Sequence, residues 1–154
     1  MKKLLTSAKF DETKDNNSTP KVRKCGRPNC GTCIHIQEKT IFEFKNKMTF
    51  TVKSDIDCSC PEIIYAITCN GCNENYIGQT GDFRKRVTVH KQQIRRPEYS
   101  KIPLSDHIRT CAEGKNPQFY IFPMYRFFHQ STETERLIKE KRFIQIFKPK
   151  LNRD

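Results

Sequence analysis

Two tyrosines, Tyr65 and Tyr76, flank a Cys-x2-Cys pair, Cys69 and Cys72, and that pair in turn brackets Asn-Gly at residues 70–71. Asn-Gly between two alternating apolar segments predicts a hairpin with a two-residue turn, because both central residues of that turn need positive φ. In such a hairpin Tyr65 faces Tyr76 directly, and the period of a strand puts both on the face that carries the two cysteines. The simplest interpretation is a cross-strand aromatic pair that covers a core. The residues expected on the same face decide between that role and a chemical one.

Two polar side chains interrupt the apolar stripe of a helix predicted over residues 82–96. Phe83, Val87 and Ile94 recur at three- and four-residue spacings, which is the pattern of a buried helix face. Arg86 and His90 are four residues apart and point to that same side. A lone histidine on such a face is usually a satisfied core residue. An arginine one turn before it is not easily explained as core, so the pair marks a candidate functional site.

A glutamate interrupts the last predicted helix, residues 131–147, in the same way. The apolar face of this helix is predicted to consist of Leu137, Phe143, Ile144 and Phe147. Glu140 lies at the centre of that face, where burial should be most complete. An unpaired buried carboxylate is costly unless a cation compensates it. A salt bridge to Arg86 is one interpretation, and ligation of a divalent metal is the other.

The eight cysteines are predicted to bind metal, because the apolar part of MKKLLTSAKF is too short for a signal peptide and a reducing compartment disfavours disulfides. One predicted zinc site consists of Cys69, Cys72, His107 and Cys111, the last two four residues apart on a helical turn. The other consists of Cys25, Cys30, Cys33 and Cys58, with Cys60 and His35 as alternatives for its fourth ligand. Buried or free thiols are the competing interpretation for both groups.

The formal net charge of +12 indicates a polyanionic partner, with nucleic acid ahead of an anionic membrane because no segment approaches a spanning helix. Residues 84–109 carry eight Lys and Arg against two acidic residues, and residues 136–153 carry seven against one. Solvated helix faces would give the same runs. The predicted DNA contacts are Arg84, Lys85, Lys91, Arg95 and Arg96.

The pattern of elements predicts an α+β fold in three parts. Residues 1–24 are polar and predict a disordered basic leader or linker. Residues 25–60 predict a Cys-rich, zinc-ribbon-like hairpin module, which needs its metal in order to fold. Residues 61–154 predict a small antiparallel sheet of about three strands flanked by helices, including an edge or bulged strand at Pro123 and a capping box that begins at Thr132.

In order and spacing, Tyr65, Tyr76-Ile77-Gly78, Arg86, His90, Glu140 and the KPKLN that ends at Asn152 resemble the GIY-YIG nuclease superfamily. The closest resemblance is to the endonuclease domain of Penelope-like retroelements, which carries a CxxC between its tyrosine motifs and an upstream cysteine cluster. It covers roughly residues 25–154. IIY replaces GIY here, and Cys111 stands where those domains use a final histidine.

The resemblance implies a role for each matching residue. Glu140 would bind one Mg²⁺ or Mn²⁺, and Tyr65 would be the general base, its pKa lowered by nearby cationic charge. Arg86 would neutralise charge on the phosphate, and Tyr76 and His90 would position water or phosphate, with His90 as an alternative base. Asn152 would hold the chain end or the phosphate.

These expectations describe a metal-dependent DNA endonuclease that nicks a phosphodiester bond. It would be the endonuclease part of a Penelope-like element or a copy derived from one, separated from a reverse transcriptase, and intracellular, in the nucleus. The alternatives are a structure-specific repair or recombination nuclease of the same superfamily, and an inactive zinc-dependent nucleic-acid-binding protein.

Overall fold

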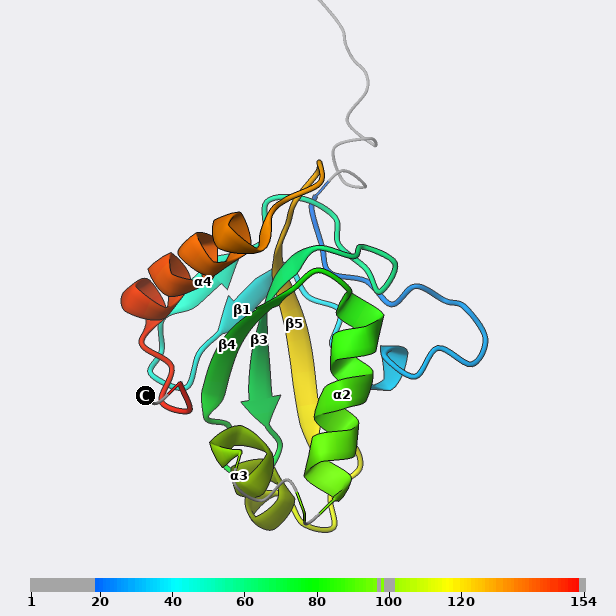
Figure 1. The fold of residues 1–154 in the computed structure, drawn as a ribbon, viewed down its shortest axis with the longest axis vertical. Helices are drawn as coiled ribbons and strands as arrows, with labels where there is room; N and C mark the ends of the chain where they lie inside the picture. The colour runs from blue at the N-terminus through cyan, green and yellow to red at the C-terminus, as the bar shows by residue number, and fades with distance from the viewer. Residues whose placement is uncertain (1–18, 97, 99–101, 153–154) are drawn as a thin grey trace, which may run out of the picture.

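The computed structural model describes residues 19–96, 98 and 102–152, so most of the predicted leader lies outside the described residues. Its centre is a three-stranded antiparallel sheet in the order β4-β3-β5. The strands are β3 (Ile63–Cys69), β4 (Asn75–Thr80) and β5 (Phe119–Arg126). This confirms the predicted α+β class with a small antiparallel sheet (Figure 1). Pro123 in β5 lies on an edge strand, opposite an irregularity at residues 64 and 65 of β3, as a residue without a backbone N–H requires.

The register of β3 with β4 differs from the prediction by two residues. Tyr65 faces Gly78, and Tyr76 faces Ile67. The loop has four residues, 70–73, and its left-handed position is Asn73, with φ 67°. Glycine is required at position 71 for a steric reason and not for the predicted turn, since a Cβ there would overlap the backbone of Cys111. A shift of two leaves each side chain on its face, so Tyr65 and Tyr76 still share one side of the sheet.

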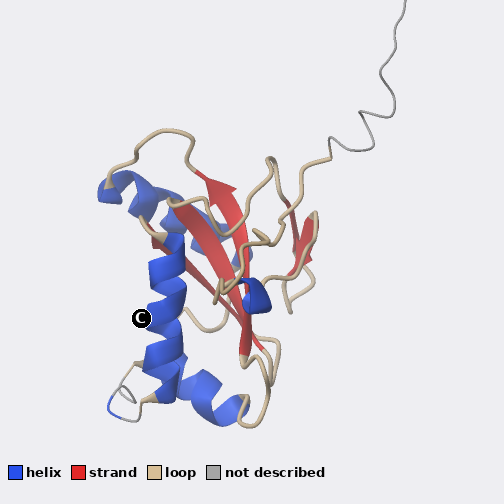
Figure 2. Cartoon of the chain, turned by 90° about the vertical axis from the view of Figure 1, so that its right-hand side faces the viewer, coloured by secondary structure: helices blue, strands red, loops and turns tan. Residues whose placement is uncertain are grey.

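The two faces of the sheet are covered by different elements. The helix α2 (Phe83–Arg95) starts at the N-cap Asp82 and packs on the Tyr65 face through Phe83, Val87, His90 and Ile94, which are all buried. The opposite face carries Phe122, whose ring stacks on Phe42 of the hairpin β1 (Ile41–Glu43) and β2 (Thr49–Thr51). Figure 2 shows α2 and this small hairpin on opposite sides of the main sheet.

The hairpin module shares one core with the three-stranded sheet and its helices. Phe44 stacks on Phe147 at 4.6 Å, which joins the module to the last helix. The order of strand, three-residue turn and strand is as predicted, with Lys47 at φ 80° closing the turn. Val22 is fully buried and bridges Ile56, so residues assigned to the leader take part in this packing. The division at residues 24 and 60 stays a prediction.

The remaining helices are a short 3-10 turn η1 (Cys33–His35), α3 (Pro103–Cys111) and α4 (Glu133–Phe147). The capping box at the start of α4 is confirmed, with Thr132 and Glu135 bonded reciprocally. α4 runs along the β4 edge of the sheet (Figure 1). Leu137 is 44% exposed, so its assignment to the buried face was wrong: Phe143 and Phe147 are the buried residues of this helix. Among the described residues, no helix combines the length and the apolar character needed to cross a bilayer.

Candidate active site and metal centres

Tyr65 is the centre of a buried polar cluster under α2. Its exposed fraction is 0%, and its hydroxyl makes a 2.8 Å hydrogen bond with His90 Nε2. Arg86 Nε donates to the same oxygen at 3.4 Å. Arg86 and His90, the two polar residues predicted on the buried face of this helix, therefore both contact Tyr65. Their spacing of one turn on α2 puts both over one side chain of β3.

Gly78 makes room for this tyrosine. It is the direct partner of Tyr65 across the sheet, and a Cβ on it would lie 2.6 Å from the Tyr65 hydroxyl oxygen and 2.7 Å from Cζ. Gly78 therefore has no side chain because the Tyr65 ring lies over its backbone.

The electrostatics of the cluster differ from the expectation for Tyr65. Burial raises its pKa above the usual range for a phenol, and the nearby Arg86 only partly offsets this. The predicted net lowering of the Tyr65 pKa was therefore wrong: Arg86 does lower it, but the cost of charging a fully enclosed hydroxyl is larger. Burial also lowers the pKa of His90 to about 3, helped by the positive charge of Arg86. His90 is therefore neutral at physiological pH, and its protonated form is disfavoured in this site.

Glu140 and Tyr76 complete the cluster from α4 and β4. Burial raises the pKa of Glu140, while the charge of Arg86 lowers it. Burial and the Glu140 charge together raise the pKa of Tyr76. The Glu140 side chain makes no hydrogen bond, and no ion pair within 4.0 Å, in the described part of the chain, so the alternative of an Arg86 salt bridge finds no contact there. The carboxylate is half-buried and has oxygen atoms available for a cation.

Asn152 lies at the free edge of β4. Its Oδ1 accepts from Ile77 N–H at 2.6 Å, and its Nδ2 donates to Ile77 O at 2.9 Å. Leu151 N–H donates to Asn75 O on the same edge. Both ends of the Asn152 amide are used in holding the chain end, which was one of its two expected roles.

An arginine network that the sequence reading did not single out fixes the start of α4. Arg136 Nε donates to Gln79 Oε1 at 3.0 Å, and Nη1 donates to Ser131 O and Oγ at 3.1 and 3.0 Å. Nη1 also lies 4.0 Å from Glu62 Oε1. Arg136 is one turn before Glu140, and these contacts hold the start of α4 against β4. A cation in the first turn of a helix opposes the helix dipole, which is the signal that could have identified it.

The upstream cysteines converge as predicted. Ligand atoms of Cys25, Cys30, Cys33 and Cys58 all lie within 4.8 Å of one another. Cys33 Sγ is 3.6 Å from Cys25 Sγ and 3.7 Å from Cys58 Sγ, and sulfurs around tetrahedral zinc at about 2.3 Å are ~3.8 Å apart. The thiolates therefore fit zinc. The alternative ligand His35 bonds Phe119 O instead, and Cys60 is not in the group.

The second predicted group also comes together. Cys69, Cys72, His107 and Cys111 place their ligand atoms within 4.8 Å of one another. Cys72 Sγ is 3.2 Å from His107 Nε2, and Gly71 N–H donates to Cys69 Sγ. One thiol at the end of β3, one from the loop that follows and two ligands one turn apart on α3 suit a closed four-coordinate site. Both groups could hold a metal such as zinc.

The predicted DNA contacts lie in different surroundings. Arg84 is not a free surface cation, because its Nη2 donates to Cys25 Sγ at 3.3 Å. Lys91 Nζ donates to Gly31 O. Lys85, Arg95 and Arg96 are exposed. Arg84 therefore ties α2, which carries Arg86 and His90, to the upstream metal group.

A small sheet with a buried tyrosine under a helix that supplies arginine and histidine, faced by a free glutamate, defines a candidate nuclease domain. The family model described as GIY-YIG catalytic domain matches residues 61–152. This is more than half of the chain, which therefore belongs to the GIY-YIG family, a family of nucleases that typically use divalent metals. A search of curated proteins and a search of solved structures found no match.

Proposed function

We propose that this protein is a metal-dependent endonuclease that nicks double-stranded DNA. The observation that carries the proposal is the half-buried Glu140 carboxylate without a bonded partner in the described chain, beside the Tyr65, Arg86 and His90 cluster. A free carboxylate in an enclosed site is costly unless a cation joins it. The net charge of +12 suits the phosphate backbone as substrate.

The donor set fits a hard divalent ion. Glu140 offers carboxylate oxygen, and Mg²⁺ or Mn²⁺ is commonly held by one or two carboxylates together with substrate phosphate. When bound, such an ion polarises the phosphate and stabilises the leaving oxygen. Glu140 is the residue that would hold it, and Arg136 would keep the carboxylate in place through α4.

The proton steps can be assigned to the chain itself. As water attacks phosphorus, its proton passes to the Tyr65 oxygen while Tyr65 hands its own proton to His90 Nε2, 2.8 Å away. This relay avoids a free buried phenolate, which the raised pKa of Tyr65 disfavours. His90 is neutral and its Nε2 lies within hydrogen-bond reach, but its low pKa disfavours the protonated ring, so the proton would stay there only while negative charge builds on the phosphate. Arg86, close to the same oxygen, would offset negative charge on the phosphate as the bond to the 3′ oxygen breaks. The 3′ oxygen takes a proton from solvent and leaves as a 3′ hydroxyl.

The proposal also covers the origin of the protein, its cellular location and its structural metal ions. The cysteine pair between the tyrosine motifs and the upstream cysteine group support a Penelope-like origin. There the 3′ hydroxyl made by the nick would prime reverse transcription by an enzyme of a longer parent protein. A nuclear location would follow from DNA as the substrate. The structural cations would be Zn²⁺ at both cysteine groups.

A plasmid-nicking assay tests this function. Zinc-loaded protein is incubated with supercoiled DNA and Mg²⁺ or Mn²⁺, and Glu140→Gln and Tyr65→Phe are compared with wild type. Both variants should lose at least about 100-fold in rate, on the scale of removing one positioned catalytic group. Glu133→Gln removes an exposed carboxylate from the same helix and should nick normally. Equal nicking by all proteins, or none by wild type, would contradict the proposal.

A further inference from the structure

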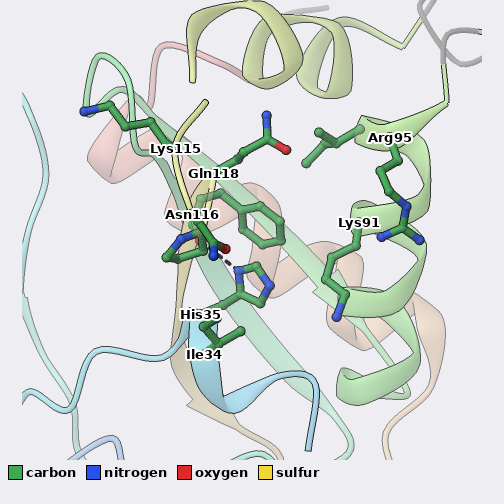
Figure 3. Close-up of a pocket in the computed structure, with 10 residues that line it drawn as sticks. Ile34, His35, Lys91, Arg95, Lys115, Asn116 and Gln118 are labelled. Atoms are coloured by element: carbon green, nitrogen blue, oxygen red, sulfur yellow. Dashed lines mark hydrogen bonds between the residues drawn. The ribbon is translucent and has the colours of Figure 1, made fainter. Parts of the chain in front are cut away.

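A concavity of about 280 Å³ lies outside the Tyr65 cluster, between η1, the last turns of α2 and the segment that leads into β5. Its apolar lining is Ile34, Ile94 and Phe119, and its cationic lining is Lys91, Arg95 and Lys115. No acidic side chain lines it within the described chain. Figure 3 shows Lys91 and Arg95 extending along one side from α2, while Lys115 points outward from the opposite rim. The hollow therefore suits a ligand with a negative group and an apolar body.

His35 adds a specific acceptor to this hollow. Its exposed fraction is 5%, and its ring stacks on Phe119 with centroids 4.2 Å apart. Nδ1 is 2.9 Å from Phe119 O. Since a carbonyl only accepts, Nδ1 carries the proton, and Nε2 of the neutral ring is an acceptor. The His35 ring and Lys91 face the same hollow (Figure 3).

The walls of the hollow are held by both cysteine groups. On one side, η1 begins at Cys33, a member of the upstream group. On the other side, Asn70 lies between Cys69 and Cys72 and bonds the pocket segment twice, through its N–H to Gln118 O and through Nδ2 to Pro117 O. Metal at the two groups would therefore keep the hollow open before a ligand arrives, which reduces the cost of binding.

We propose that this hollow binds one unpaired nucleotide of a nucleic-acid strand. The base would lie against Ile34 and Ile94 with an N–H edge toward His35 Nε2, and its phosphate would lie at Lys91 and Arg95. The volume is just under the ~300 Å³ at which small-ligand pockets begin, so it suits a single nucleotide. The inference rests on the proposed function, since it takes nucleic acid to be the substrate. It adds that a base must leave the duplex, or already be single-stranded, on the β5 side of α2.

Binding of short strands without catalysis tests the base. Fluorescence anisotropy of the zinc-loaded full chain, without Mg²⁺, would compare labelled oligo(dT) with an abasic strand of equal length and charge. Wild type should bind the abasic strand at least about five-fold more weakly, as base contacts in single-strand sites predict. Ile34→Glu should abolish this preference. Ile41→Glu is the matched control, because Ile41 is 53% exposed and Ile34 is 52% exposed, and it should keep the preference.

The salt dependence of binding tests the phosphate contacts. A Lys91→Gln, Arg95→Gln double variant should reduce the slope of log K against log salt by about 1.4, from two lost contacts to a single strand. The exposed pair Lys24→Gln, Lys53→Gln removes the same charge elsewhere and should leave the slope unchanged. Zinc content and thermal melting of each variant would verify that the fold is kept.

These readouts separate the two hypotheses. Equal affinity of wild type for both strands, or equal effects of Ile34→Glu and Ile41→Glu, would overturn the pocket assignment whatever the nicking assay gives. Displacement of oligo(dT) by dTMP at micromolar concentration would assign the hollow to a free nucleotide and would also overturn it. A base preference that is lost in Ile34→Glu would support the pocket even in a protein that does not nick.

Discussion

Replacing Gly78 by alanine should disable the site without touching any polar group. The new Cβ would lie 2.6 Å from the Tyr65 hydroxyl oxygen and 2.7 Å from Cζ, where ordinary contact begins at 3.4 Å. Tyr65 must therefore move by up to 0.8 Å, the difference between 3.4 and 2.6 Å. It is fully buried, so it cannot move without disturbing its bond with His90. A displacement of about 1 Å at a reacting group costs about 100-fold in rate, and overpacking costs about 1–3 kcal/mol in stability.

Single-turnover nicking and chemical denaturation would measure the two effects. Gly31→Ala is the control, because its Cβ would meet only the flexible Lys91 Nζ at 3.0 Å. The cost of Gly78→Ala in unfolding free energy should be smaller in a Tyr65→Phe background, where the hydroxyl is gone. A Gly78→Ala protein that nicks within two-fold of wild type would refute the reasoning. So would an equal stability cost in both backgrounds, which would place the clash elsewhere.

The folded-state pKa of His90 is about 3, below the unfolded value of about 6.5, so on acidification the unfolded chain binds the extra proton first. The stability that this histidine contributes is therefore full above pH 6.5. Between pH 6.5 and 3 the free energy of unfolding falls by up to about 1.4 kcal/mol per pH unit. Denaturation of His90→Gln, at constant zinc, should show a shallower acid slope than wild type; parallel slopes would contradict this. Arg136→Lys cannot bridge Gln79 and Ser131 together and should raise the Mg²⁺ concentration for half-maximal nicking several-fold, whereas the exposed Arg142→Lys should not. Removal of zinc by a strong chelator should abolish hydrogen-exchange protection across residues 69–111 and nicking with it, and a zinc-free protein with native protection would disprove that prediction.

Short-range patterns were sufficient where a single element carries the information. The stripe of α2, the capping box at Thr132 and the hairpin turn at residues 45–47 depend on neighbours in sequence, and each is found as predicted. The two ligand groups were also predictable, because metal geometry restricts ligand type and spacing more tightly than packing does.

Errors arose where a distant segment determined the outcome. The Asn-Gly pair suggested a two-residue turn, but Gly71 is small because the end of α3 lies against it. Leu137 matched the helical period, yet α4 packs mainly through Phe143 and Phe147. None of these contacts is encoded within one turn or one strand.

By itself, the amino-acid sequence determined which residues could do chemistry: the tyrosines, the arginine and histidine one turn apart, the glutamate among the apolar residues of the last helix and the two cysteine groups. Only the tertiary structure decided their charge states and directions. The reason is that burial depends on every segment that covers a group, so the raised pKa of Tyr65 and the neutral state of His90 come from the packing of β3, β4 and α2 together.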